Sequence, residues 1–303
     1  MRQPEGFEQN GSGWVWHLLK SLYGLKQSPH VWHQKLNSVL ESMGFSRILC
    51  EHSIWIYHRG VCVIIPVFID DVTFAVKSKS EIQKVKDELS THFKLHDLGP
   101  ASWLLGVKIE CDCRNHTLHL SQCQYILDLL QWFDLTDINP VGTPLDPSIQ
   151  LSTSMAPQTP EEIAEMQGVP YINAVGALNY LAIATCPDIS YAIGVLACFT
   201  NNPGMQHWKA VKHLFRYLKG TLDYKLTYSP SPSIELFTTF SDADHAGNPD
   251  NGRSTSGYLV KVGTGAISWR SQLQTLVALS TTEAEFISAV PAAHSWVFPW
   301  VPS

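Results

Sequence analysis

The chain has 303 residues, of which 45% are hydrophobic and only 16% charged, a composition typical of a globular protein and not of a disordered one. Its formal net charge is −6, which argues against a protein that binds a polyanion over its whole surface, so any contact with nucleic acid must be local. The length allows two domains, or one large domain with a fragment of another.

The cysteines and the hydropathy pattern indicate where the protein resides. Seven cysteines, an odd number, lack the spacing of a disulfide framework, which favours reduced thiols. The N-terminal MRQPEGFEQNGSG has no apolar core of signal-peptide length, and the longest apolar stretch, Val61 to Ile69, is too short to cross a bilayer. We therefore expect a soluble, non-secreted, intracellular protein, with its compartment left open.

Two stretches rich in Pro, Ser and Thr, Pro140 to Pro160 and Ser229 to Ser233, interrupt the periodic pattern. They divide the chain into three expected parts, residues 1–145, 146–232 and 233–303. The first and last parts mix strand and helix patterns, whereas Tyr171 to Lys219 is helical in pattern. The fold class we predict is therefore α/β in the broad sense, with α and β elements mixed.

The first part contains two predicted hairpins. Val61 to Ile69 and Val72 to Val76 are apolar and β-branched on either side of Asp70 and Asp71, which predicts a hairpin with the two aspartates at or beside its turn. Pro66 removes a backbone donor and fits best at an edge or bulge. Residues 103–113 and 117–121 predict a second hairpin.

Helices are predicted after each hairpin. Residues 78–93 carry an apolar stripe, with Ser80 and Gln83 as a capping box at the start, and residues 122–133 form a second helical pattern. In the last part, strands at 235–244, 257–263 and 266–271 precede a helix capped by Ser280 and Glu283. We expect Pro291 to break that helix, and an exposed tail that includes Pro299.

Asp70 and Asp71 are two like charges inside an apolar run, where unpaired burial would be costly. Adjacent strand residues point to opposite faces, so the two carboxylates converge on one ion only if the backbone turns there. A Mg²⁺ ion takes one or two protein carboxylates and would offset the repulsion. A solvated turn between two strands is the alternative.

A second acidic set lies in the last part. Asp242 and Asp244 are two apart at the end of a predicted strand and share a face. Glu283 already serves the capping box, which leaves Glu285 without a structural explanation. Taken alone, an Asp followed by a Glu about 40 residues later is a weak signal, and a solvated acidic surface is the simpler interpretation.

Two further clusters of residues could bind a ligand. Zinc ligation is suggested by a run of cysteines and histidines, but its spacing fits no standard site and an ordinary hairpin is the simpler interpretation; these residues are Cys111, Cys113, His116, His119 and Cys123. The predicted helix 207–219 carries one basic face that could follow phosphates or could simply be solvated; its members are Lys209, Lys212, Arg216 and Lys219. The chain has no GxxxxGK, GxSxG or HExxH motif.

Taken together, a dozen segments resemble the reverse transcriptase and RNase H region of copia-type long-terminal-repeat retrotransposon polyproteins, in family order. They include QPEGF at 3–7, KSLYGLKQSP at 20–29, VFIDDV at 67–72, LLGVKIE at 104–110, VGALNYLAIATCPDISYAI at 175–193, HWKAVKHLFRYLKGT at 207–221, SDADHAG at 241–247 and ALSTTEAEF at 278–286.

The resemblance implies a polymerase palm-like subdomain in 1–145, a helical thumb or connection region in 146–232, and the N-terminal part of an RNase H-like fold in 233–303. It implies RNA-directed DNA polymerisation and hydrolysis of RNA in RNA–DNA hybrids, with Mg²⁺ or Mn²⁺ as cofactor. The partners would be an RNA template, a DNA primer or hybrid, and deoxynucleoside triphosphates. The implied metal ligands are Asp70, Asp71, Asp242 and Glu285.

The chain departs from the family pattern in ways that bear on activity. The family places another palm aspartate before the QPEGF segment and further RNase H aspartates after the last segment here. His30, Cys186 and His245 stand where the family usually has a basic residue, an arginine and a tryptophan. We therefore expect a fragment with little or no activity alone; the alternative is a remnant that binds nucleic acid or protein without catalysis.

Overall fold

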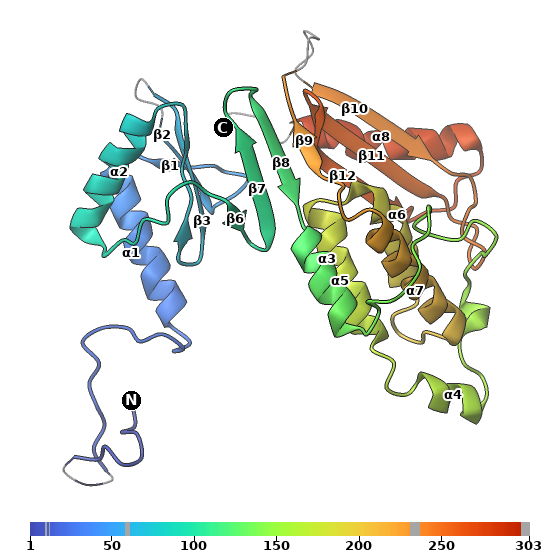
Figure 1. Cartoon of the computed structure of the whole chain (residues 1–303), viewed down its shortest axis with the longest axis horizontal. Coiled ribbons are helices and arrows are strands. Elements are labelled where there is room, and N and C mark those ends of the chain that lie inside the picture. The colour runs from blue at the N-terminus through green and yellow to red at the C-terminus, as the bar shows by residue number, and fades with distance from the viewer. Residues whose placement is uncertain (10, 12, 58–60, 231–236, 298–303) are drawn as a thin grey trace. The chain divides into compact units, whose positions relative to one another are not determined.

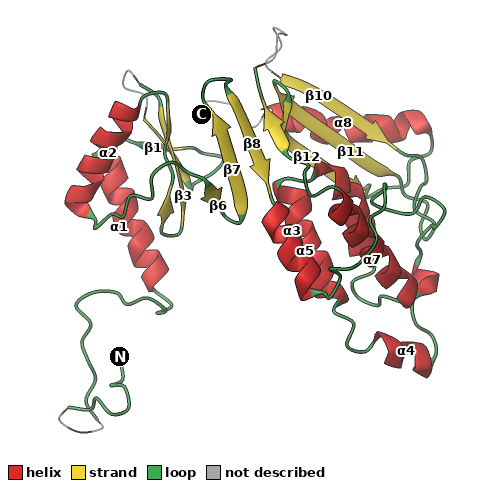
Figure 2. Ribbon diagram, in the orientation of Figure 1, coloured by secondary structure: helices red, strands yellow, loops and turns green. Residues whose placement is uncertain are grey.

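The computed structural model describes residues 1–303 except 10, 12, 58–60, 231–236 and 298–303 (Figure 1). The chain folds into two compact units, Met1–Gly99 and Pro100–Ser303. The described residues form eight α-helices and three antiparallel sheets (Figure 2), so the expected mixture of α and β elements is confirmed.

The first unit contains one antiparallel sheet in which strand β3 is central. β3 pairs with β2 on one side and with both β4 and β5 on the other, and β1 pairs with the outer edge of β2. The strands are β1 (Ser46–Arg47), β2 (Ile54–Tyr57), β3 (Val63–Phe68), β4 (Asp71–Val72) and β5 (Ala75–Val76). The predicted hairpin around the aspartates is thus confirmed.

Two helices, α1 (Ser28–Ser42) and α2 (Lys79–His92), pack on this sheet. Burial alternates along β3, where Val63, Ile65 and Val67 are buried and their neighbours are not, as expected for a strand covered on one face. Their side chains share a hydrophobic core with residues of β2 and both helices, including Leu36, Leu40, Trp55 and Leu89.

The predicted helix over residues 78–93 is confirmed, but its predicted capping box is wrong. The helix begins at Lys79, with Ser78 as its N-cap and no side-chain cap hydrogen bond. The hydroxyls of Ser78 and Ser80 bond to each other at 2.7 Å, and the Gln83 amide donates to Asp87. Either serine hydroxyl could have capped the helix, but the two hydroxyls bond to each other, so neither accepts a hydrogen bond from a backbone N–H of the first turn.

The second unit begins with a sheet that joins distant parts of the chain. The predicted hairpin is confirmed as β7 (Val107–Asp112) and β8 (Thr117–Ser121), flanked by β6 (Trp103–Leu104) and β9 (Leu226–Tyr228). β9 follows the last helix of the helical part and pairs with β8, so that Leu118 lies opposite Tyr228.

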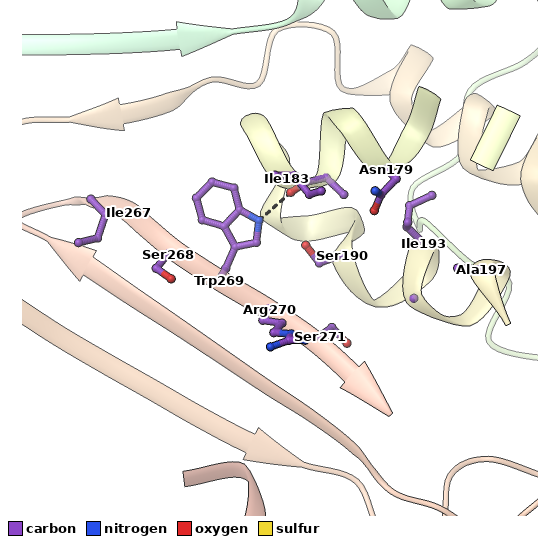
Figure 3. Close-up of a pocket in the computed structure, with 12 residues that line it drawn as sticks. Asn179, Ile183, Ser190, Ile193, Ala197, Ile267, Ser268, Trp269, Arg270 and Ser271 are labelled. Carbon is purple, nitrogen blue, oxygen red and sulfur yellow. Dashed lines mark hydrogen bonds between the residues drawn. The ribbon is translucent and has the colours of Figure 1, made fainter. Parts of the chain in front are cut away.

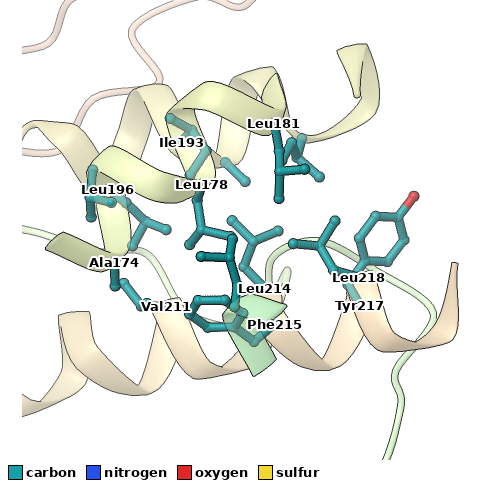
Figure 4. Close-up of a cluster of buried hydrophobic side chains, with 14 of the residues drawn as sticks. Ala174, Leu178, Leu181, Ile193, Leu196, Val211, Leu214, Phe215, Tyr217 and Leu218 are labelled. Carbon is teal, nitrogen blue, oxygen red and sulfur yellow. The ribbon is translucent and has the colours of Figure 1, made fainter. Parts of the chain in front are cut away.

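Helices fill the middle of this unit, as predicted. Residues of α3, α5, α6 and α7 share one large core, in which Leu178, Leu214 and Phe215 are completely buried (Figure 4). The short α4 has the capping box of Thr159 and Glu162. The helices are α3 (Cys123–Trp132), α4 (Pro160–Met166), α5 (Tyr171–Ala184), α6 (Ser190–Ala197) and α7 (Met205–Gly220), with 3₁₀ turns at Thr153–Met155 and Pro187–Ile189.

The last part is a three-stranded antiparallel sheet, β10 (Phe237–Ala243), β11 (Thr255–Val262) and β12 (Gly265–Leu273), followed by α8 (Thr281–Val297). The expectation that Pro291 breaks the helix is wrong, because α8 continues through it. Contacts before and after Pro291 hold the helix in place. The Ser288 hydroxyl donates a hydrogen bond to the Asp242 carbonyl, and Ala292 is buried. Pro299 lies outside the described residues.

Candidate functional site

Asp70 and Asp71 lie at the tip of the β3–β4 hairpin. Phe68 pairs with Asp71, so Ile69 and Asp70 form a two-residue turn. Both aspartates are exposed, and within the described part of the chain neither carboxylate has a hydrogen-bond or ion-pair partner. The turn therefore presents two adjacent carboxylates, free to bind a cation, at one end of a sheet whose middle is buried.

Ile69 gives this turn an unusual backbone. Its φ is +55°, a left-handed conformation that a β-branched side chain rarely adopts. The indole Nε1–H of Trp32, from α1, donates a 2.7 Å hydrogen bond to the Ile69 carbonyl. Trp32 was not among the predicted site residues, because nothing in the spacing of residues 32 and 69 indicates that they meet.

Pro66 interrupts the ladder beside the turn without shifting its register. Val67 pairs with Val72 and Ile64 with Ala75 in one continuous alignment, and the gap between β4 and β5 falls between these pairs. The Pro66 carbonyl still accepts a hydrogen bond from the Thr73 N–H. The missing Pro66 donor therefore explains why the strand opposite β3 is split in two.

Asp242 and Glu285 are brought to neighbouring elements. Asp242 is the penultimate residue of β10, and Glu285 lies on α8 one turn before Ser288, whose hydroxyl donates to the Asp242 carbonyl at 2.6 Å. The same hydroxyl also contacts the Gly257 carbonyl of β11 at 3.2 Å. Both acidic side chains are exposed, and the Asp242 carboxylate accepts one hydrogen bond, from the adjacent Ala243 N–H. Ser288 thus fixes the face of α8 that lies against the end of β10.

The other two acidic residues of this set have structural roles. Asp244 accepts a 2.6 Å hydrogen bond from the Thr255 N–H, which closes the loop between β10 and β11. Glu283 accepts from the Leu279 N–H, and its own N–H donates to the Ser280 hydroxyl. The predicted cap at Ser280 is confirmed, although the Glu283 carboxylate reaches back one residue further than in a capping box.

The basic face of α7 divides into two pairs. Arg216 donates through Nε to the Asn139 carbonyl at 2.7 Å, and Lys219 donates to the Thr136 carbonyl at 2.6 Å. Lys209 and Lys212 have no such partner among the described residues and line a cavity of about 420 Å³. Arg216 and Lys219 therefore hold the loop that follows α3, whereas Lys209 and Lys212 remain available to bind a ligand.

The cysteine and histidine run occupies the β7–β8 hairpin. Cys111 and Cys113 lie on one face, with their sulfur atoms 3.7 Å apart, while His119 contacts the Thr227 hydroxyl of β9. Over the described ranges, no group of three or more His, Cys, Asp or Glu side chains is arranged to hold a metal ion. The aspartates of the β3–β4 turn and of β10 likewise form no such group.

One cavity of about 410 Å³ lies where α5 and α6 meet β12 (Figure 3). Trp269 of β12 points toward α5, and its indole N–H donates a 2.7 Å hydrogen bond to the Ala182 carbonyl. Asn179 and Ser190 contribute polar groups to its helical wall. No sequence pattern indicated this cavity, because its walls come from segments about 80 residues apart.

Comparison of the sequence with known proteins shows which family the chain belongs to. A family model described as reverse transcriptase (RNA-dependent DNA polymerase) matches residues 1–147. The Retrovirus-related Pol polyprotein from transposon TNT 1-94 of Nicotiana tabacum is 42% identical over 301 residues, 98% of this chain and 22% of that polyprotein. The polyprotein from transposon RE1 of Arabidopsis thaliana is 36% identical over 95% of this chain and 19% of its own length.

A shorter relative is the Putative transposon Ty5-1 protein of Saccharomyces cerevisiae, 31% identical over 95% of this chain and 92% of that protein. The chain spans about a fifth of the length of the Pol polyproteins that it matches. No solved structure matches it. None of the described helices is both long enough and apolar enough to span a membrane. The chain belongs to the copia-type retrotransposon Pol polyprotein family and carries its reverse transcriptase region.

Proposed function

We propose that the β3–β4 turn is part of the metal site of an RNA-directed DNA polymerase, with Asp70 and the adjacent Asp71 as metal ligands. The observation that carries the proposal is the pair of exposed carboxylates where the β3–β4 turn meets β4, neither of which has a hydrogen-bond or ion-pair partner among the described residues. The substrates would be an RNA template, a DNA primer and deoxynucleoside triphosphates, as the reverse transcriptase family implies.

The donor set fits Mg²⁺ or Mn²⁺. Both are hard cations that take oxygen ligands, and Mg²⁺ is commonly held by one or two carboxylates while substrate phosphates and water complete its octahedron. Bound ions would supply activation of the primer 3′-hydroxyl and stabilisation of the leaving oxygens. Asp70 and Asp71 contribute two negative charges at a turn that solvent and substrate can reach.

We propose further that residues 237–297 are the beginning of an RNase H-like fold, which hydrolyses RNA in RNA–DNA hybrids. Support comes from three antiparallel strands followed by a helix, with Asp242 at the end of the first strand and Glu285 in the first turns of the helix. The Ser288 hydrogen bond keeps that helix against β10. In this proposal Asp242 and Glu285 are metal ligands.

Both reactions need a complete carboxylate set, since each ion must be held in near-octahedral geometry while it binds substrate. Within the described residues the acidic side chains at each site number two, and no larger group occurs. We therefore propose that this chain alone has little or no activity, and that the remaining ligands come from other parts of a longer polyprotein.

Primer extension on an RNA template with Mg²⁺ or Mn²⁺ tests these proposals. The chain is assayed alone and as part of a polyprotein segment that extends beyond both of its ends, with Asp70→Asn and, as matched control, Asp87→Asn on α2. We expect extension only by the longer segment, lost in Asp70→Asn and kept in Asp87→Asn. Wild-type extension by Asp70→Asn would contradict the polymerase site, and extension by the chain alone would contradict its inactivity.

The alternative function is nucleic-acid binding without catalysis, and the free pair on α7 favours it. Lys209 and Lys212 face a cavity and have no described partner, so they can bind phosphates. Replacing both with Ala should weaken binding to an RNA–DNA hybrid and reduce the slope of log affinity against log salt by about 2. An unchanged slope would exclude these two residues from the binding surface.

A further inference from the structure

The residue that fixes the β3–β4 turn comes from a helix. We propose that Trp32 is a positioning residue for the metal site, which it holds in shape through the Ile69 carbonyl so that Asp70 and Asp71 can bind one cation together. This inference rests on the proposed polymerase function of the turn. It assigns a role to a side chain that would itself touch neither metal nor substrate.

The hydrogen bond acts on the peptide that joins Ile69 to Asp70. The Trp32 Nε1–H lies 2.7 Å from the Ile69 oxygen, and the direction of that oxygen sets the orientation of the whole planar peptide group. The same plane determines ψ of Ile69 and φ of Asp70. Fixing this oxygen therefore fixes the direction in which Asp70 leaves the turn relative to Asp71.

Ile69 needs such a constraint. At φ +55° it occupies a region that is unfavourable for a β-branched residue, and strained backbone of this kind persists only when the surrounding structure holds it. The residue is 61% exposed, so packing around Ile69 itself supplies little restraint. The Trp32 hydrogen bond is a contact from outside the hairpin that opposes relaxation of the turn.

Trp32 is itself held by two helices. It lies in α1, whose residues Leu36 and Leu40 are buried in the core of the first unit. Its ring packs edge-on against Phe93, at the end of α2, with ring centroids 5.1 Å apart. The donor is therefore packed against the core of the first unit, and one hydrogen bond connects the turn to that core.

The consequence concerns metal binding more than folding. Neighbouring strand residues point to opposite faces, and only the turn allows both carboxylates to reach one ion. Loss of the Trp32 donor frees the peptide plane to rotate and lets the carboxylates diverge. Partners that orient metal ligands typically contribute a factor of about 10 to 100 in metal affinity, so we expect at least a tenfold loss.

The test uses the full chain, with Mn²⁺ as the probe. Mn²⁺ broadens the NMR signals of nearby amides, and titration of the Asp70 and Asp71 amide signals gives an apparent Kd. Trp32→Phe removes the donor and keeps an aromatic ring against Phe93. Trp103→Phe, at an exposed tryptophan of β6, is the matched control. Urea unfolding of each variant reports stability separately.

We expect Trp32→Phe to raise the apparent Kd about tenfold or more, whereas Trp103→Phe leaves it unchanged. In an Ile69→Gly background the turn no longer needs an outside restraint, because glycine adopts positive φ without strain, so Trp32→Phe should then have a much smaller effect. A stability loss with unchanged Kd would show a structural role only, and an equal effect in both backgrounds would overturn the strain argument.

The Asp70→Asn variant distinguishes failure of the proposed metal site from failure of the proposed role of Trp32. If Asp70→Asn fails to weaken Mn²⁺ binding, the proposed metal site is wrong. If Asp70→Asn weakens binding and Trp32→Phe does not, the metal site stands and the positioning role of Trp32 is overturned.

Discussion

His207 in α7 offers a sharp test of how the loop before α4 is held to the helical core. The side chain is completely buried. Its Nδ1 accepts a 2.9 Å hydrogen bond from the Gly204 N–H, and its Nε2 lies 3.1 Å from the Ser152 carbonyl. The ring also stacks on Phe199 at 4.1 Å. Since Nδ1 accepts, the proton of the neutral imidazole belongs on Nε2, which donates to Ser152.

Replacing His207 with Phe keeps a ring to stack on Phe199 but removes both hydrogen bonds. The Gly204 N–H then stays buried without a partner, at a cost of about 1–3 kcal/mol. Ser152 is half-buried, so water can partly replace the donor to its carbonyl. We expect the variant to lose about 2–4 kcal/mol of unfolding free energy at pH 7.5.

The pH dependence has a defined sign. Burial lowers the pKa of His207 below its ordinary value of 6.5, only partly offset by the Ser152 hydrogen bond and by Asp250. The unfolded chain therefore binds more protons than the folded chain below pH 6.5, so the His207 contribution to stability is complete above that pH and declines as the pH falls. The difference in unfolding free energy between wild type and His207→Phe should therefore be smaller at pH 5.5 than at pH 7.5.

Urea unfolding followed by tryptophan fluorescence at both pH values measures these differences. His245→Phe, at an exposed histidine of the same unit, is the control and should change stability by less than about 0.5 kcal/mol. The reasoning is refuted if His207→Phe is as stable as the control at pH 7.5, or if its gap to wild type does not shrink at pH 5.5.

Two further predictions concern close packing and charge in the second unit. A Cβ on Gly204 would overlap the Met155 carbonyl oxygen, so Gly204→Ala should lower the unfolding free energy by about 1–3 kcal/mol. Gly176→Ala is the control, because a Cβ there meets nothing within 4 Å, and it should leave the unfolding free energy equal or higher. Equal melting temperatures for the two variants would contradict the packing argument. Hydrogen bonds from two lysines lower the pKa of Glu110 to about 2, so its contribution to stability is present above pH 4.5 and lost as the pH falls toward 2. Lys225→Met should move the Glu110 pKa upward in an NMR titration of its carboxyl carbon, and an unmoved pKa would exclude the ion pair.

Local sequence pattern predicted most of the elements and failed at one helix start and at one proline inside a helix. The β3–β4 hairpin, helix α2 and the β7–β8 hairpin follow from apolar periodicity and turn composition, which depend on neighbours in the chain. The wrong cap at Ser80 and the wrong break at Pro291 arose where a competing contact decided the outcome. A hydrogen bond between two hydroxyls and a helix docked on a sheet are not visible in local pattern.

For the candidate sites, the sequence supplied the acidic residues, and the fold supplied their surroundings. Asp70 and Asp71 stand out because two charges interrupt an apolar run, and Glu285 because its neighbour Glu283 has a capping role. The roles of Arg216 and Lys219 as loop anchors did not follow from the helical pattern, since their acceptors lie about 80 residues earlier in the chain.

The family, the placement of most helices and strands, and the acidic residues proposed to bind metal all follow from residue types at short spacing along the chain. Tertiary structure alone decided that Trp32 meets Ile69, that β9 joins β8, and that His207 meets Ser152. Each of these contacts joins residues far apart along the chain, and their meeting depends on how whole elements bury their apolar faces against one another.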